Sequence, residues 1–448
     1  MKLQKFKAEG VHEYLNYDFD FDDKLTFLIG INGSGKTSVL KLILGLVSPS
    51  FNYLNSIDHK FAQITCSHNE QVIVIQSESS EDNKLRLSVT INEKEIVNEI
   101  KKLKKIEGIT NEEFRKISSQ HIEEFENLTF TKKLLEFKTP FFLGLDRRIY
   151  EGHQIDKMNR IIYSRKYNDF PISDHLNRSL IEIQEVIYDY YRLIASEQPR
   201  INSEFKNNVL LQTFEFIETR EFNVFRDKKE LAEKRDKATE AFKNLKVDGI
   251  VDSLNKFFDS LNNTFIEFTE VQKKRRDKSD FETADIDIIQ KWFNNQPQLK
   301  KIDNLIEFNK KYQDELQKLY EPIEKTKIII NEFFKESKKE LIIDSKGEMK
   351  IKLKNGDEVN LYQLSSGEKQ IIILLGNLIY FVEKSKNEPG IFIVDEPEIS
   401  LHLSWQEIFV TSLINASPNT QFVIATHSPA IISEFSDATF NDLAILNI

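Results

Sequence analysis

Cysteine is almost absent from this chain, which has only Cys66 among its 448 residues. One cysteine excludes internal disulfides and zinc sites built from cysteines, and it suits a reducing cytoplasm. Long apolar runs are missing as well: the longest, residues 371–382, is interrupted by Gly376 and Asn377 and is too short to cross a bilayer. The N-terminal residues MKLQKFKAEGVHEYL contain no apolar signal core. We therefore expect a soluble cytoplasmic protein with no membrane partner.

The chain also lacks an excess of basic residues, because 62 Lys and Arg residues face 72 Asp and Glu residues and the net charge is −10. A protein that coats nucleic acid usually presents a basic field over much of its surface. One dense basic cluster consists of Lys273, Lys274, Arg275, Arg276 and Lys278. We interpret it as part of a solvated loop at residues 271–280, and a local contact with nucleic acid stays open as the alternative.

The segment from Leu25 to Leu44, LTFLIGINGSGKTSVLKLIL, carries the strongest functional signal. A short apolar run ends at Gly30, and after Thr37 apolar residues recur at helical spacing, which predicts a strand, a glycine loop and a helix. Residues 30–37 fit the pattern G-x-x-x-x-G-K-[ST], in which backbone N–H groups surround a phosphate at the positive end of a helix. The pattern predicts that this chain binds a nucleotide.

Four residues of this loop have expected roles. Gly33 and Gly35 let the backbone approach a phosphate because they have no Cβ atom. Lys36 is expected to place a positive charge between the β- and γ-phosphates, and the Thr37 hydroxyl is expected to bind Mg²⁺. A glycine-rich turn between any strand and helix could look similar, but the complete pattern is much more specific than such a turn.

The rest of the first 150 residues has mainly β character. Residues 1–22 alternate as in a β meander. Further β-rich runs, which predict an antiparallel arm, lie at residues 60–68, 71–78 and 84–92. Residues 101–137 are charged and are expected to be helical. Residues 140–148 predict a short buried strand that ends in Asp146, Arg147 and Arg148, in the position from which strands usually deliver polar side chains to a site.

Long, charged helices with few glycines are expected from about residue 150 to residue 340. In two of them apolar residues step by three and four, as in helices that pair in coiled coils, if Asn309 is accepted at one position of the second helix. These residues are Leu180, Ile183, Ile187, Tyr190 and Ile194 in the first helix, and Ile302, Leu305, Tyr312, Leu316, Leu319 and Ile323 in the second. A loop is predicted at Gln296-Pro297, and Pro322 is expected to bend the last helix or to end it.

β character returns after residue 339 as a predicted hairpin, and a second glycine-containing segment follows. Leu364 to Gln370, LSSGEKQ, opens an apolar helix. Ser365 or Ser366 is a suitable N-cap, and with Gly367 the free N–H groups predict a second anion site. Taken alone, an ordinary capped helix would explain these residues equally well.

Two further apolar strands are predicted to end in polar residues. Residues 390–394 lead to Asp395 and Glu396, two adjacent carboxylates whose desolvation is unfavourable without a counter-ion. We predict that Asp395 faces Mg²⁺ and that Glu396 polarises a water molecule. Residues 420–426 lead to His427, which we expect to contact the γ-phosphate, because open parallel sheets bind ligands at the carboxyl ends of their strands.

Four segments, in this order, resemble a known family: GINGSGKT, LSSGEKQ, IFIVDEPEISLH and VIATHS. They are similar to the ABC-type P-loop ATPase heads of SMC, Rad50 and RecF-like proteins. The run E-P-E-x-S-L-H resembles more closely the AAA15 or OLD-like bacterial ATPases, including the stand-alone ATPases of anti-phage systems of the PARIS and Septu type. The resemblance implies an α/β head formed by residues 1–150 and 341–448, with an antiparallel β arm and a large helical, coiled-coil insertion at 151–340.

The resemblance also implies a composite site for ATP and Mg²⁺. One subunit would hold the nucleotide, and the signature residues Ser366 and Gly367 of a second subunit would close over the γ-phosphate in a homodimer or higher oligomer. Pro397 to His402 would form the D-loop at that interface. The implied residues are Asn32, Gly33, Ser34, Gly35, Lys36, Thr37 and Ser38 for ATP, Thr37 and Asp395 for Mg²⁺, and Glu396, His427 and Lys36 for catalysis. Relatives often have a glutamine where this chain has Asp146, Arg147 and Arg148, so the role of these three residues stays open.

Two functions fit these residues. The first is an ATP-gated switch whose heads dimerise and control a separate nuclease effector in an anti-phage system, with a nucleic acid or a phage protein as the trigger. The second is an SMC-like or RecF-like ATPase that repairs or tethers DNA directly. A self-contained OLD-like nuclease would need a metal-binding segment after the head, and the sequence ends soon after His427. Transport is disfavoured because the helical insertion is too long. We therefore expect ATP hydrolysis, but no cleavage of DNA or RNA by this chain alone.

Overall fold

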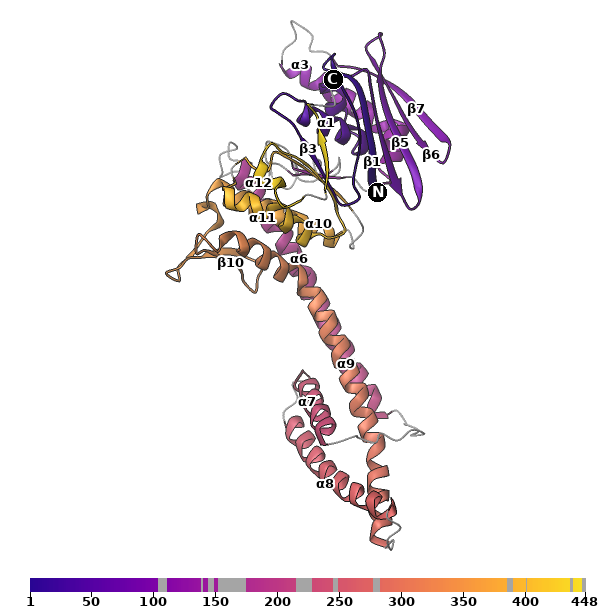
Figure 1. Ribbon diagram of the computed structural model, residues 1–448, viewed down its shortest axis with the longest axis vertical. Coiled ribbons are helices and arrows are strands. Elements are labelled where there is room, and N and C mark those ends of the chain that lie inside the picture. The colour runs from indigo at the N-terminus through magenta and orange to yellow at the C-terminus, as the bar shows by residue number, and fades with distance from the viewer. Residues whose placement is uncertain are drawn as a thin grey trace. The chain divides into compact units, whose positions relative to one another are not determined.

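The computed structural model describes residues 1–103, 111–137, 140–143, 149–151, 175–214, 228–244, 249–276, 283–384, 390–399, 401–435 and 438–444 (Figure 1). The chain forms two compact units. The first contains Met1–Tyr188 and Pro322–Ile448, and the second contains Asp189–Glu321. Asp146, Arg147, Arg148 and Ser400 of the predicted site lie outside the described residues.

A six-stranded sheet with the strand order β15-β3-β14-β13-β8-β9 forms the centre of the first unit. Its strands are β3 (Leu25–Ile29), β8 (Phe141–Leu143), β9 (Ile149–Glu151), β13 (Ile391–Asp395), β14 (Gln421–Ala425) and β15 (Thr439–Asp442). All neighbours are parallel except β8 and β9. Every residue of β13 and β14 is buried, as their continuous apolar sequences predict for strands covered on both faces. The predicted α/β fold class is confirmed.

A second sheet is antiparallel and has the order β2-β1-β4-β5-β6-β7. Its strands are β1 (Lys2–Val11), β2 (Leu15–Asp20), β4 (Phe61–His68), β5 (Gln71–Ser79), β6 (Lys84–Ile91) and β7 (Lys94–Lys101), of which β1, β5, β6 and β7 are labelled in Figure 1. The predicted meander and the predicted arm are therefore one sheet, joined where β1 pairs with β4. The sequence analysis did not predict β7, whose side chains are mostly exposed.

Helix α1 (Lys36–Val47) packs between the two sheets. It contacts β13 and β14 of the parallel sheet and β4 and β5 of the antiparallel sheet. Its residues Val39, Leu40 and Ile43 are fully buried. Because burial of each such side chain stabilises the fold by about 1.5–3 kcal/mol, α1 and the loop before it are held at the core.

The first unit contains several further helices and a small third sheet. They are α2 (Phe51–Ser56), α3 (Asn111–Asn127), α4 (Thr129–Leu134), α10 (Ser366–Lys384), α11 (Leu403–Ala416), α12 (Pro429–Ile432), the 3₁₀ turn η1 (Leu361–Gln363), and a small antiparallel sheet of β10 (Glu340–Ile343), β11 (Met349–Lys352) and β12 (Glu358–Val359). The small sheet confirms the hairpin predicted after residue 339. None of the helices in the described ranges is both long and apolar enough to cross a membrane.

Among the residues that the structure describes, the second unit is built from four helices, two of which continue into the first. They are α6 (His175–Phe214), α7 (Lys228–Asn244), α8 (Ile250–Arg276) and α9 (Thr283–Phe334). Within this unit α6 and α9 pair: the Tyr190 hydroxyl donates to the Leu319 carbonyl at 3.0 Å, and the rings of Phe205 and Tyr312 stack at 4.7 Å. The apolar residues that the sequence analysis placed at steps of three and four along both helices are buried or half-buried.

Two loop predictions in this region are wrong. Residues 271–276 continue α8, because Phe268 and Val271 are buried and carry its apolar stripe onward. Gln296-Pro297 lies inside α9, and so does Pro322. Proline in a helix is unfavourable by about 3 kcal/mol, but Trp292 and Leu299 on either side of Pro297 are buried in the core of this unit. Tertiary packing therefore outweighs the local signal on which the prediction relied.

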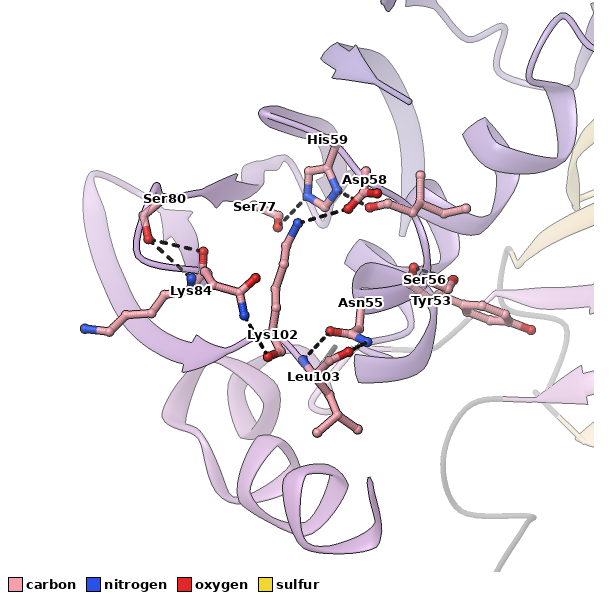
Figure 2. Close-up of polar contacts among 12 residues, drawn as sticks. Tyr53, Asn55, Ser56, Asp58, His59, Ser77, Ser80, Lys84, Lys102 and Leu103 are labelled. Atoms are coloured by element: carbon pink, nitrogen blue, oxygen red, sulfur yellow. Dashed lines mark hydrogen bonds and ion pairs between the residues drawn. The ribbon is translucent and has the colours of Figure 1, made fainter. Parts of the chain in front are cut away.

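Polar side chains hold the segment between α2 and β4 in place (Figure 2). His59 is buried, with Nδ1 2.8 Å from the Ile57 carbonyl and Nε2 3.0 Å from the Ser77 hydroxyl. The Asn55 side chain exchanges two hydrogen bonds with the backbone of Leu103. Burial, with a smaller effect of Lys102, lowers the pKa of His59 to about 4. The imidazole is therefore neutral in the folded protein.

We expect this histidine to make stability depend on pH. Between pH 6.5 and pH 4 the unfolded chain binds a proton that folded His59 does not, so the free energy of unfolding falls as pH falls through this window, by about 2 kcal/mol between pH 7.5 and pH 5. The measurement is urea unfolding of the wild type and of His59→Gln at both pH values. A variant that keeps the whole pH dependence would show that His59 does not cause it.

Candidate functional site

The carboxyl ends of three neighbouring strands meet at one edge of the parallel sheet. In the strand register Asp395 of β13 pairs with Ala425 of β14, and Ala425 pairs with Leu28 of β3. The ladder continues one step further, because the Thr426 N–H donates to the Leu28 carbonyl and the Glu396 N–H donates to the Ala425 carbonyl. The glycine loop, the acidic pair and the strand end that leads to His427 thus come together, as the sequence predicts.

Glycine loop residues 30–35 take the shape that the motif requires. Gly33 and Gly35 have φ angles of 89° and 84°, in the left-handed region that favours glycine. The Tyr17 hydroxyl, from β2 of the antiparallel sheet, donates to the Ser34 carbonyl at 2.9 Å. A Cβ atom on Gly35 would lie 2.1 Å from that hydroxyl oxygen, whereas one on Gly33 would meet no atom within 4 Å. The antiparallel sheet therefore contacts the glycine loop at Ser34 and Gly35 through Tyr17.

Lys36 and Ser34 present polar groups inside this loop. Lys36 is only 5% exposed, and its Nζ donates to the carbonyls of Gly30 at 2.8 Å and Ile31 at 3.3 Å. Ser34 Oγ is buried and has no hydrogen-bond partner among the described residues. A buried polar atom without a partner is unusual in a folded protein. Together with the free N–H groups at the start of α1, these atoms suit an anion.

Thr37 and Asp395 join the two ends of the sequence. Thr37 Oγ1 donates to Asp395 Oδ2 at 2.9 Å, and the other carboxylate oxygen, Oδ1, is buried without a hydrogen-bond partner in the described part of the chain. Burial raises the pKa of Asp395 to about 6 against the opposing effect of the Thr37 hydrogen bond, and the charge of Glu396 raises it further. Hydroxyl and carboxylate oxygens are the ligands that Mg²⁺ prefers. The two side chains therefore fit Mg²⁺, and their role as its ligands stays a prediction.

Glu396 follows β13 in an uncommon backbone conformation. Its φ angle is 46°, in the left-handed region that non-glycine residues rarely adopt. Such strain persists where the surrounding structure fixes it, and it is found most often at functional sites. The hydrogen bond from the Glu396 N–H to Ala425 and one from Ile399 to the Glu396 carbonyl hold it. The half-buried Glu396 therefore directly follows the carboxyl end of β13.

His427 lies at the end of β14 and is bound by a residue that the sequence analysis did not single out. Glu398 Oε1 accepts from the His427 backbone N–H at 2.8 Å and lies 2.8 Å from the His427 Nδ1. The E-P-E run contains this glutamate, but nothing in its spacing indicated a histidine partner 29 residues later. Tyr17 and His12 were also missed; His12 Nε2 lies 2.8 Å from the Ser38 hydroxyl.

The predicted signature segment starts α10. Ser365 is its N-cap and forms a capping box with Glu368: Glu368 Oε2 accepts from the Ser365 N–H at 2.9 Å, and the Glu368 N–H approaches Ser365 Oγ at 3.4 Å. Lys339 binds the same carboxylate at 2.7 Å. Ser366 is exposed and Gly367 is buried. The choice between Ser365 and Ser366 as the N-cap is therefore settled in favour of Ser365.

The other predicted residues take simple positions. Asn32 is exposed at the tip of the loop, and Ser38 is half-buried on the first turn of α1. Within the described ranges, no group of three or more His, Cys, Asp and Glu side chains could hold a metal ion. The candidate site thus consists of the glycine loop, the Thr37 hydroxyl, the carboxylates of Asp395 and Glu396, and His427.

The fold and this site define a P-loop nucleotide-binding protein. The chain matches the AAA_15 family, described as an AAA ATPase domain, over residues 1–432, and it belongs to that family. Membership of this family makes the chain an ATPase of the AAA_15 type, and its relatives include proteins named as probable ATPases.

Several proteins are similar to this chain over short stretches. The Retron Vc95 probable ATPase of Vibrio cholerae serotype O1 biovar El Tor is 34% identical over 102 residues, which cover 21% of this chain and 19% of that protein. The Septu protein PtuA of Bacillus thuringiensis is 32% identical over 107 residues, 22% of this chain and 26% of that protein. Endonuclease GajA of Bacillus cereus (strain VD045) is 31% identical over 120 residues, 24% of this chain and 21% of that protein. These alignments span about a quarter or less of each relative.

Among solved structures, the Smc head domain with an extended coiled coil from Pyrococcus furiosus aligns with 96% of this chain and 91% of its own, at 14% identity and a TM-score of 0.38. The SMC head domain from Thermotoga maritima aligns with 97% of this chain and 92% of its own, at 12% identity and a TM-score of 0.36. The α/β architecture and the long helices of this chain are described above from its own sheets and helices.

Replacing Gly35 by alanine is expected to destabilise the nucleotide-free protein more than replacing Gly33. Both variants bear the strain of a positive φ, about 1–2 kcal/mol, but only Gly35→Ala adds the overlap with Tyr17, about 1–3 kcal/mol more. Adding Tyr17→Phe to Gly35→Ala removes the overlapping hydroxyl and should restore part of the loss. The measurement is the free energy of unfolding of the three variants without nucleotide. Equal destabilisation by the two alanines would contradict the packing of Tyr17 under the loop.

Proposed function

We propose that this chain binds and hydrolyses ATP with Mg²⁺ and that the bound nucleotide closes the heads of two copies against each other, as an ATP-gated switch. The observation that carries the proposal is the contact between Thr37 and Asp395, with a buried carboxylate oxygen left without a partner beside a glycine loop. A hydroxyl and a carboxylate placed together in this way suit the metal that accompanies a nucleoside triphosphate.

Each residue of the site has a role in this proposal. The loop from Asn32 to Ser38 surrounds the phosphates, and Lys36 supplies a positive charge to them. Thr37 and Asp395 would hold Mg²⁺, which neutralises phosphate charge when bound. Glu396 accepts a proton from the attacking water, and His427 contacts the γ-phosphate.

The signature of a second copy completes the site. Ser366 is exposed at the N-terminus of α10, where backbone N–H groups favour an anion. On the proposed D-loop and at the start of α11, Ile399 and Leu403 are 40% and 60% exposed. Exposed apolar side chains of this kind suit a surface that a second copy covers when ATP is bound. Ser366 and Gly367 would then contact the γ-phosphate held by the partner.

The cellular role that we propose is control of a separate nuclease effector in an anti-phage system, in the cytoplasm. Relatives named as a retron ATPase, a Septu protein and an endonuclease support this role over DNA repair. A nucleic acid or a phage protein would act as the trigger. Direct repair or tethering of DNA by an SMC-like ATPase is the alternative, and ATP-dependent retention of duplex DNA by this chain alone would favour it.

Glu396→Gln is expected to trap the closed pair. The amide keeps the size of the side chain but cannot accept the proton of the attacking water, so hydrolysis should fall by roughly 10²-fold while ATP still binds. The measurements are the ATPase rate and the molar mass by light scattering, with and without ATP. Hydrolysis at the normal rate would show that Glu396 is not the base.

Lys36→Ala and Ser366→Arg should separate ATP binding from closure. The first variant removes the charge that neutralises phosphate and should abolish binding. The second leaves the loop of each head intact but places a bulky cation at the surface that meets the partner, so it should bind ATP and remain monomeric. ATP binding by calorimetry and molar mass by light scattering test both. Equal loss of binding in the two variants would argue against a composite site.

A further inference from the structure

Glu398 makes an unusually one-sided set of contacts. Its side chain is 6% exposed, and Oε1 alone lies 2.8 Å from both the backbone nitrogen and the ring Nδ1 of His427. Its second oxygen, Oε2, is buried and has no hydrogen-bond partner among the described residues. Among the described residues, the hydrogen bonds of this carboxylate therefore all go to His427. A carboxylate used only to stabilise the fold would be expected to satisfy both of its oxygens.

The chemistry of the two groups fixes where a proton lies. An ionised carboxylate can only accept hydrogen bonds, so the His427 Nδ1 must carry a hydrogen and donate it to Glu398. The histidine tautomer is thus set by the bond at one nitrogen, and the other nitrogen, Nε2, is left for a ligand. The His427 side chain is 47% exposed, which gives a ligand access to it.

We infer that Glu398 is a positioning residue for the reaction: it fixes the orientation and the tautomer of His427, so that Nε2 meets the γ-phosphate. The inference rests on the proposed role of His427. With Nδ1–H committed to Glu398, Nε2 donates to a phosphate oxygen only when the ring carries a second proton. In that form His427 and Glu398 are an ion pair at 2.8 Å, and the phosphate meets a cation rather than a neutral donor.

A second contact at the same place offers a matched control. Ser428 Oγ, on the residue after His427, donates to Gln406 Oε1 at 2.6 Å. Gln406→Leu therefore removes this hydrogen bond and the one that Gln406 Nε2 donates to the Leu401 carbonyl at 2.9 Å, but none to the His427 ring. Glu398→Gln keeps an oxygen that can accept both bonds from His427 and removes the negative charge. Glu398→Leu removes both the acceptor and the charge.

The test is a double-mutant cycle on ATP hydrolysis by the full chain. We expect Glu398→Gln to lower kcat about 10-fold, within the range for the partner of a functional histidine, because it removes the negative charge that pairs with the doubly protonated ring. The affinity for ATP and the melting temperature should stay near those of the wild type. In the His427→Ala background the same change should alter kcat less than 2-fold, because Glu398 acts through the ring that is now missing. Gln406→Leu should change kcat less than 2-fold in either background.

The inference is overturned if Glu398→Gln hydrolyses ATP at the wild-type rate, or if its loss of kcat is as large without His427 as with it. A nucleotide-free readout separates this failure from failure of the proposed function. In the chain labelled with ring ¹⁵N histidine, the His427 signal, identified by its loss in His427→Ala, should show a protonated Nδ1 in the wild type and in Glu398→Gln but not in Glu398→Leu. If the wild type neither binds nor hydrolyses ATP but shows this pattern, the proposed function and the catalytic part of the inference fail, and only the tautomer assignment stands. If Nδ1 lacks its proton in the wild type, the inference itself is wrong.

Discussion

The hydrogen bond between Thr37 and Asp395 is the contact on which the rest of the site depends. It joins residues 358 positions apart in the sequence, and it brings the first helix after the glycine loop against the end of β13. The bond forms only because β3, β14 and β13 are neighbours in one sheet and end at the same level. The two sequence segments of the first unit therefore have to assemble before the site exists.

The antiparallel sheet contributes to the site as well as to the core. Tyr17 of β2 supports the glycine loop through the Ser34 carbonyl, and α1 is packed between the two sheets. Gln421 at the start of β14 is fully buried, and its side chain exchanges hydrogen bonds with the backbone of Leu3 in β1. A buried amide is tolerated only when its polar atoms are satisfied, so this contact fixes how the sheets meet. The position of the loop thus follows from the packing of both sheets.

The sequence predicts the strands and the loop well because their signals are local. The P-loop pattern, the apolar runs before Asp395 and His427, and the alternation in the antiparallel arm depend on neighbouring residues. Prediction was wrong at Pro297, where burial of side chains such as Trp292 outweighs a local helix-breaking signal, and at residues 271–276, where a polar sequence continues the apolar stripe of α8. Tyr17 and Glu398 were missed for a related reason: each acts through a contact that only the tertiary fold creates. The roles of the predicted site residues remain predictions.

The dependence of ATP binding on Mg²⁺ in the wild type and in Asp395→Ala, measured by calorimetry with Mg²⁺ or with EDTA, tests most directly whether this edge of the sheet binds ATP and its metal. If Thr37 and Asp395 hold the metal, the wild type should bind ATP more tightly with Mg²⁺ than with EDTA, and this difference should disappear in Asp395→Ala. An affinity that does not change with EDTA in the wild type, or a difference of the same size in the variant, would contradict the assignment of this edge of the sheet as the site for ATP and its metal.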